Sequence, residues 1–106
     1  MLTLFPGMFD GMLNHSILKR AIEKNHLEVK LYNIRDFAED KHKMTDDTPY
    51  GGGGGMVMKP EPIFAAVEHI IAVHQLQSYQ IIYLTPQGTL LTQQLAKTLA
   101  LEPELI

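Results

Sequence analysis

The sequence contains no cysteine among its 106 residues. A disulfide framework and a metal site built on thiolates are therefore both excluded. No apolar stretch reaches the roughly 18 residues that a membrane-spanning helix requires. The first residues also lack the basic segment ahead of an apolar one that is typical of a secretory signal, so we expect a cytoplasmic protein.

An excess of positive charge is also missing. Nine lysines and arginines stand against twelve aspartates and glutamates, which gives a formal net charge of −3. The chain as a whole therefore offers no basic field to nucleic acid, although a local basic patch is compatible with this balance. Its length and its 45% of apolar residues are typical of one soluble globular domain with a modest core.

Glycine, in contrast, is concentrated in one place, because five glycines stand in a row at Gly51–Gly55. Backbone without Cβ atoms serves either as a flexible linker or as a surface on which main-chain N–H groups approach a ligand closely. The flanks favour the second interpretation, since a proline-stiffened Tyr50 precedes the run and Met56 leads from it into apolar sequence. Met56 also stands where the common phosphate-binding loops need a glycine, so this loop is of another kind.

The apolar pattern predicts strands and helices in alternation. Such an order favours an α/β fold with a mostly parallel sheet and flanking helices. The expected strands are 1–5, 27–32, 80–84 and a start at 105–106, and the expected helices are 8–24, 59–74 and one after Thr89 or Thr92 that closes before Pro103.

Local signals mark several helix ends. Ser16 is expected to cap the second piece of a divided first helix, and Asn25 to end it in a left-handed conformation. Thr89 or Thr92 is expected to cap the last helix.

Several side chains that could bind ligands are assigned to structural roles. Met8 and Met12 are expected to fill the core. His42 has no second ligand at metal-binding spacing, and His69 and His74 are not spaced for a metal either, so we predict no metal site.

Two charged segments have two interpretations each. Arg35 and Asp36, at the end of a predicted strand, form either a weak surface pair or a set that holds a binding loop in place. Residues 38–47 are expected to form an exposed loop, in which Lys41, His42 and Lys43 either contact phosphates or are simply solvated.

The segment Thr85–Gly88 follows a predicted buried strand. Proline at its second position and glycine at its fourth suit a type I turn. Ligands of open α/β sheets bind beyond the carboxyl ends of the strands, which makes this turn a candidate binding loop.

Four segments together resemble one enzyme family. They are Leu4–Phe9, Asn33–Phe37, Asp46–Met58 and Tyr83–Gly88. In this order and spacing they resemble the N-terminal part of bacterial tRNA (guanine-N1)-methyltransferases, the trefoil-knotted enzymes of the SPOUT class. The acidic, proline, tyrosine and glycine string around Tyr50 is the specific part of the likeness, and the turn at Pro86 is the weaker part.

The resemblance implies a homodimer that transfers a methyl group from S-adenosylmethionine to N1 of the guanine next to the anticodon of tRNA on its 3′ side. It implies these cofactor-binding residues: Tyr83, Leu84, Thr85, Pro86 and Gly88. It implies these residues facing the guanine and the tRNA: Lys41, His42, Asp46, Asp47, Tyr50, Gly51, Gly52, Gly53, Gly55 and Met56.

The chain also departs from the family pattern. Gly7 stands where the family commonly has an acid, and Gly54 where other residues also occur. Residues 1–106 are expected to be a SPOUT-type domain cut before its knot segment, without the C-terminal domain or the catalytic arginine and aspartate. Such a fragment is expected to be inactive. The alternative is a small non-catalytic α/β interaction module that uses the loop Tyr50–Met56 to bind a partner.

Overall fold

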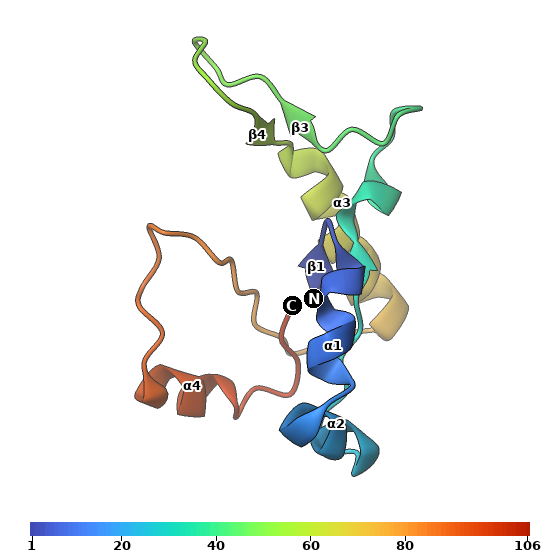
Figure 1. Cartoon of the computed structure of the whole chain (residues 1–106), viewed down its shortest axis with the longest axis vertical. Coiled ribbons are helices and arrows are strands. Elements are labelled where there is room, and N and C mark those ends of the chain that lie inside the picture. Colours follow the sequence, from blue (N-terminus) through green and yellow to red (C-terminus); the bar gives the residue numbers. More distant parts are fainter. The chain divides into compact units, whose positions relative to one another are not determined.

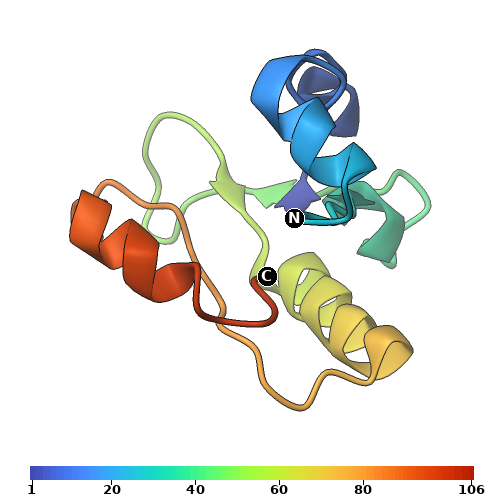
Figure 2. The same cartoon turned by 90° about the horizontal axis from the view of Figure 1, so that it is seen from below.

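The computed structural model describes residues 1–106, which form two compact units, 1–66 and 67–106. Four α-helices, labelled in Figure 1 and seen from below in Figure 2, carry most of the regular structure. The division between the units falls within the helix α3 (Pro60–His74). Each unit is described by itself below. None of the helices combines the length and apolarity needed to cross a membrane.

The first unit begins with a parallel strand pair. β1 (Leu2–Thr3) and β2 (Tyr32–Asn33) pair so that Leu2 lies opposite Tyr32 and Thr3 opposite Asn33. The α-amino group of Met1 extends the pairing by donating a hydrogen bond to the Lys30 carbonyl at 2.8 Å, and partial burial lowers the pKa of this amino group. Helices connect the two strands, as the alternating pattern predicted.

That connection is broken, as the sequence predicted, but not in the predicted manner. It consists of a 3-10 helix η1 (Pro6–Phe9), then α1 (Asp10–Leu13) and α2 (Ser16–Glu23). The predicted cap at Ser16 is wrong: Ser16 is the first residue of α2 with φ 54°, and the position before it, His15, makes no side-chain cap. Asn25 ends α2 at φ 57°, which confirms the left-handed stop.

Met8 and Met12 do not fill the core. Their side chains are 78% and 49% exposed, and neither η1 nor α1 contains a buried residue. The predicted strand 27–32 is also much shorter than expected. Only its last residue belongs to β2, since β1 has two residues and offers no partner for the rest.

The glycine run lies in an antiparallel hairpin that the sequence analysis did not predict. β3 (Asp46–Asp47) pairs with β4 (Val57–Met58), with Asp46 opposite Met58 and Asp47 opposite Val57. The segment 38–47 is mostly exposed, as predicted, but its end belongs to this hairpin and Thr45 within it is buried. A 3-10 helix, η2 (Ile34–Phe37), follows β2.

Helix α3 follows the hairpin directly and forms at the predicted place. Pro60 occupies its first position and Glu61 its first turn, which suits the missing proline N–H and the positive end of the helix dipole. Of its predicted apolar stripe, Ile70 is buried and Ile63, Val67 and Ile71 are half-buried. The stripe is therefore the covered face of the helix.

The second unit holds the rest of α3, the helix α4 (Gln93–Leu99) and a short parallel contact. Thr92 precedes α4, and its Oγ1 accepts a hydrogen bond from the Leu95 amide at 3.1 Å, which confirms it as the cap. The predicted strand 80–84 is reduced to an isolated parallel bridge between Gln80 and Leu105. One further bond joins the Ile82 amide to the Ile106 carbonyl at 2.9 Å, so residues 104–106 pair with this segment only at its start.

Thr45 is the one side chain of this chain with a buried polar atom and no hydrogen-bond partner. It is 1% exposed, and its Oγ1 is the orphaned atom. A buried unpaired hydroxyl costs about 1–3 kcal/mol, and an apolar group of the same shape avoids that cost. We expect Thr45→Val to raise the free energy of unfolding by about 1 kcal/mol in chemical denaturation. Thr45→Ser, which keeps the hydroxyl and loses the methyl group, is the control and should destabilise; a Val variant weaker than Ser would contradict the prediction.

Candidate functional site

The five glycines form the loop that closes the β3–β4 hairpin (Figure 1). At its base, the Lys59 amide donates to the Thr45 carbonyl at 2.7 Å, one step beyond the strand pairs. At its start, the Gly52 amide donates to the Pro49 carbonyl at 3.3 Å and closes a turn around Tyr50. The Tyr50 side chain is fully exposed. The loop is therefore tethered at both ends and presents an aromatic ring to solvent.

Backbone conformation explains why this loop is made of glycine. Gly51, Gly52, Gly53 and Gly55 have φ values of 81°, 77°, 145° and 93°, which L-residues rarely adopt. Gly54 alone does not have a positive φ in that range. A Cβ added at any of the five would meet no atom within 4 Å. Glycine is thus needed here for its φ angles, and the space beside the loop is open.

A groove of about 720 Å³ runs along the base of the hairpin within the first unit. Three predicted substrate residues line it: Asp47, Tyr50 and Gly51. The other lining residues are Phe37, Ala38, Glu39, Asp40, Met44, Thr48, Pro49, Val57, Met58, Lys59, Pro60, Glu61, Pro62 and Ala65. The predicted residues Lys41, His42, Asp46, Gly52, Gly53, Gly55 and Met56 do not line it. The contribution of α3 to this groove was not predicted, because the helix pattern and the prolines at its start do not indicate which segment the helix packs beside.

The carboxylates of this region are held by neighbouring amides. Asp47 Oδ1 accepts a hydrogen bond from the Thr48 amide at 2.8 Å, and Asp40 Oδ1 accepts one from the Met44 amide at 2.7 Å. Both bonds fix local loop shape in the way that short acidic side chains commonly do. One carboxylate oxygen of Asp47 is therefore engaged by the Thr48 amide, while Asp47 also borders the groove.

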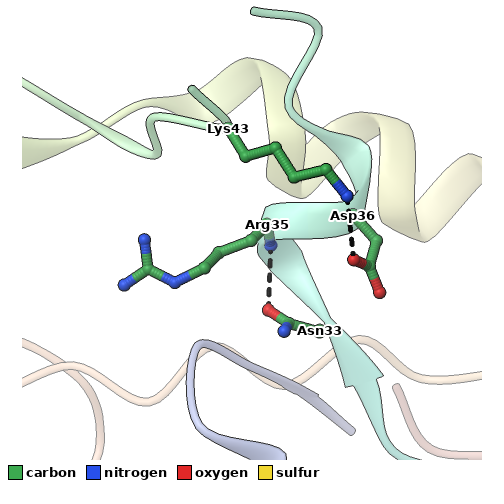
Figure 3. Close-up of polar contacts among 4 residues, drawn as sticks. All are labelled: Asn33, Arg35, Asp36 and Lys43. Carbon is green, nitrogen blue, oxygen red and sulfur yellow. Dashed lines mark hydrogen bonds and ion pairs between the residues drawn. The ribbon is translucent and has the colours of Figure 1, made fainter. Parts of the chain in front are cut away.

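Arg35 and Asp36 do not pair with each other. Asp36 lies 3.5 Å from Lys43 Nζ, and the Arg35 amide donates to Asn33 Oδ1 at 3.0 Å (Figure 3). The Arg35 guanidinium lies over the Phe5 ring, 5.9 Å from its centre. The two residues thus tie η2 to the loop 38–44 on one side and to the start of the chain on the other. Lys43 is engaged in this contact, whereas Lys41 and His42 are exposed without a side-chain partner.

The Thr85–Gly88 turn forms as predicted in the second unit. The Gly88 amide donates to the Thr85 carbonyl at 3.0 Å, and the Gln87 amide donates to Thr85 Oγ1 at 3.3 Å. A Cβ on Gly88 would stand 3.2 Å from the Thr85 carbonyl oxygen, so the turn is tight. Ahead of it, the side chains of Tyr83 and Leu84 are 78% and 88% exposed. No group of three His, Cys, Asp or Glu side chains in the chain could hold a metal ion.

Comparison with known proteins identifies the family of this chain. The family model described as tRNA (Guanine-1)-methyltransferase TrmD matches residues 1–106, which is the whole chain. The chain belongs to this methyltransferase family. The resemblance seen in the four sequence segments is thereby confirmed.

Individual relatives give the same result. The chain is 49% identical to a tRNA (guanine-N(1)-)-methyltransferase of Clostridioides difficile and 56% identical to one of Geotalea uraniireducens, over 99% of its own length in both cases. The crystal structure of tRNA (m1G37) methyltransferase from Aquifex aeolicus matches with a TM-score of 0.83 and 34% identity over 98% of this chain. The likeness confirms the α/β fold class.

The chain is shorter than these methyltransferases. It spans 46% of the Clostridioides protein, 42% of the Geotalea protein and 46% of the Aquifex chain. What it shares with them is therefore the part that holds the glycine hairpin and the Pro86 turn.

Proposed function

We propose that this chain is part of an enzyme that transfers a methyl group from S-adenosylmethionine to N1 of the guanine adjacent to the tRNA anticodon on its 3′ side. The observation that carries the proposal is the glycine hairpin beside its groove, in a chain of the tRNA (guanine-1)-methyltransferase family. We further propose that the enzyme acts as a homodimer in the cytoplasm, with tRNA as its partner and no part in DNA or membrane binding.

In this proposal the hairpin faces the target guanine. Four glycines at positive φ leave main-chain groups uncovered by side chains, and a flipped-out base needs such close backbone approach. Tyr50, fully exposed beside them, offers a ring to a base. The remaining residues assigned to guanine and tRNA are Asp46, Asp47, Met56, Lys41 and His42.

The cofactor loop is assigned to residues 83–88. The fit rests on their chemistry: Tyr83 and Leu84 are exposed apolar side chains beside a tight turn, and adenosine binds to apolar surface and backbone groups. Tyr83, Leu84, Thr85, Pro86 and Gly88 would hold the cofactor, which supplies the methyl group when bound. A Cβ on Gly88 would crowd the Thr85 carbonyl, so the shape of the loop depends on that glycine.

The reaction also requires a base, because guanine N1 carries a proton at neutral pH and must lose it as the methyl group is transferred. Asp46 and Asp47 are the only carboxylates in the hairpin strands, and we assign them to structure or base recognition. We assign no catalytic residue to this chain. The base and its partners would come from the remaining length of the protein.

The test uses a polypeptide extended to the length of the relatives. With a transcript whose anticodon-adjacent guanine is intact, we expect incorporation of one labelled methyl group per tRNA and recovery of N1-methylguanosine on nuclease digestion. With adenine at that one position, incorporation should fall to background, because adenine has an amino group where guanine has the O6 acceptor, and a site that hydrogen-bonds guanine leaves such a base unpaired. Equal incorporation into both transcripts would overturn the proposed specificity.

A second outcome would favour the interaction module. If the extended polypeptide transfers no methyl group and gives no heat when titrated with S-adenosylhomocysteine, the methyltransferase assignment fails for this protein, and the hairpin becomes a partner-binding loop.

A further inference from the structure

A second cleft of the first unit lies along helix α2, the blue helix that follows α1 in Figure 1, and continues past the C-terminal end of that helix. It is shallow, about 300 Å³, and is lined by Ile17, Arg20, Ala21, Lys24 and His26. The first four stand at i, i+3, i+4 and i+7, so they share one face of the helix. Arg20, Lys24 and His26 are exposed and border the same cleft; together they are called the basic face of α2.

The cations of this face have no acidic partner in the chain. The only acid of α2, Glu23, lies 3.7 Å from Lys19 instead. The other ion pairs join Lys30 to Glu28 and Lys43 to Asp36. Arg20 and Lys24 are therefore uncompensated cations in a chain whose net charge is −3, and the His26 ring beside them adds an N–H donor. This local cluster of positive side chains contrasts with the negative net charge of the whole sequence.

These side chains are also not needed to close the end of the helix. The Asn25 amide donates to the Ile22 carbonyl at 3.0 Å, and the His26 amide donates to the Ala21 carbonyl at 2.9 Å. With Asn25 in the left-handed conformation, this is the pattern in which backbone amides satisfy the last carbonyls. The Arg20, Lys24 and His26 side chains stay free to contact a ligand, and the turn fixes His26 beside the cleft.

We propose that the basic face of α2 binds phosphate groups of the tRNA backbone. This inference rests on the proposed function, which makes tRNA the substrate, and adds a contact outside the glycine hairpin and the Pro86 turn. Charge complementarity decides the occupant: unpaired cations along one helix face match a row of phosphates. The Arg20 guanidinium can bind a phosphate through two N–H groups, whereas Lys24 acts as a point charge. Such contacts add affinity without reading sequence.

The test uses the unmodified protein and its variants, each as a polypeptide of the relatives' length. Their tRNA binding is measured by fluorescence anisotropy at several salt concentrations. We expect the triple variant Arg20→Gln, Lys24→Gln, His26→Gln to bind tRNA about tenfold more weakly, with a salt slope smaller by about 1 for each phosphate that the protein no longer neutralises. Methyl transfer should show a raised KM for tRNA with kcat unchanged. The variant Arg20→Lys, Lys24→Arg should keep most of the affinity, because it retains one guanidinium and one ammonium group on this face, and it thereby separates charge from folding.

The matched control is Lys19→Gln, on the same helix but paired with Glu23, and it should leave the salt slope unchanged. Unchanged tRNA binding by the triple variant overturns the inference while leaving the proposed methylation intact. Loss of binding by the triple variant supports it even if no methyl transfer is detected, so the two proposals can fail separately. If the triple substitution weakens adsorption to vesicles of anionic phospholipid but not tRNA binding, the face serves a membrane surface and the inference is wrong.

Discussion

Replacing Gly53 by alanine is expected to lower kcat/KM for tRNA methylation by about 5- to 150-fold in a polypeptide of the relatives' length. Gly53 has φ 145° in the hairpin loop, where a Cβ is disfavoured. A residue with a Cβ held in such a sparsely populated backbone region costs on the order of 1–3 kcal/mol, and each 1.4 kcal/mol is about a tenfold change in rate or binding. In the Gly53→Ala variant, the loop either keeps its conformation at that cost in free energy or adopts another conformation. In the second case its main-chain groups no longer face the substrate in the same way.

The chain supplies a matched control one residue away. Gly54 does not have a positive φ in the strained range, and a Cβ there also meets no atom within 4 Å. Gly54→Ala should therefore change kcat/KM by no more than about twofold, as is usual for surface substitutions away from special backbone positions. Equal losses in the two variants would mean that flexibility of the run matters and its backbone conformation does not.

Features set by neighbouring residues in the chain could be predicted from the sequence. Helix α3 formed at its prolines and apolar stripe, Thr92 capped α4, Asn25 stopped α2, and Thr85–Gly88 closed as a turn. Each depends on a hydrogen bond or a dihedral angle within a few residues. The same holds for the glycine loop, whose composition reveals the need for unusual φ values.

Features set by a distant partner could not be predicted in this way. The length of a strand depends on how many residues its neighbour offers, so 27–32 and 80–84 shrank to the few positions that β1 and residues 104–106 could pair. The burial of Thr45, and the groove that α3 completes beside Asp47, depend likewise on tertiary contacts. The apolar character of Met8 and Met12 predicts that they are buried, but it does not specify which segment would cover them.

The 106-residue chain by itself is expected to show no methyl transfer above background, whereas a polypeptide of the relatives' length should be active. The expected loss is at least about 10³-fold, because the general base, which alone contributes about 10²–10⁴-fold, and its positioning groups are both assigned elsewhere. The measurement is labelled methyl incorporation into tRNA at equal molar protein. Clean transfer by the 106-residue chain would refute both the assignment of the base and the incompleteness of the site.

The loop 83–88, which we propose to bind the cofactor, supplies the structural reason for this expectation. Large apolar side chains of a preorganised binding loop are expected to be at least partly covered, yet Tyr83 and Leu84 are 78% and 88% exposed. The segment 80–84 pairs only with residues 104–106, so little holds the loop in one conformation. Titration with S-adenosylhomocysteine should therefore give no measurable heat with the 106-residue chain and a saturating isotherm with the longer polypeptide. Equal affinity of the two polypeptides for S-adenosylhomocysteine would show that residues 83–88 are preorganised without further structure. The loss of activity would then be due to the lack of the general base alone.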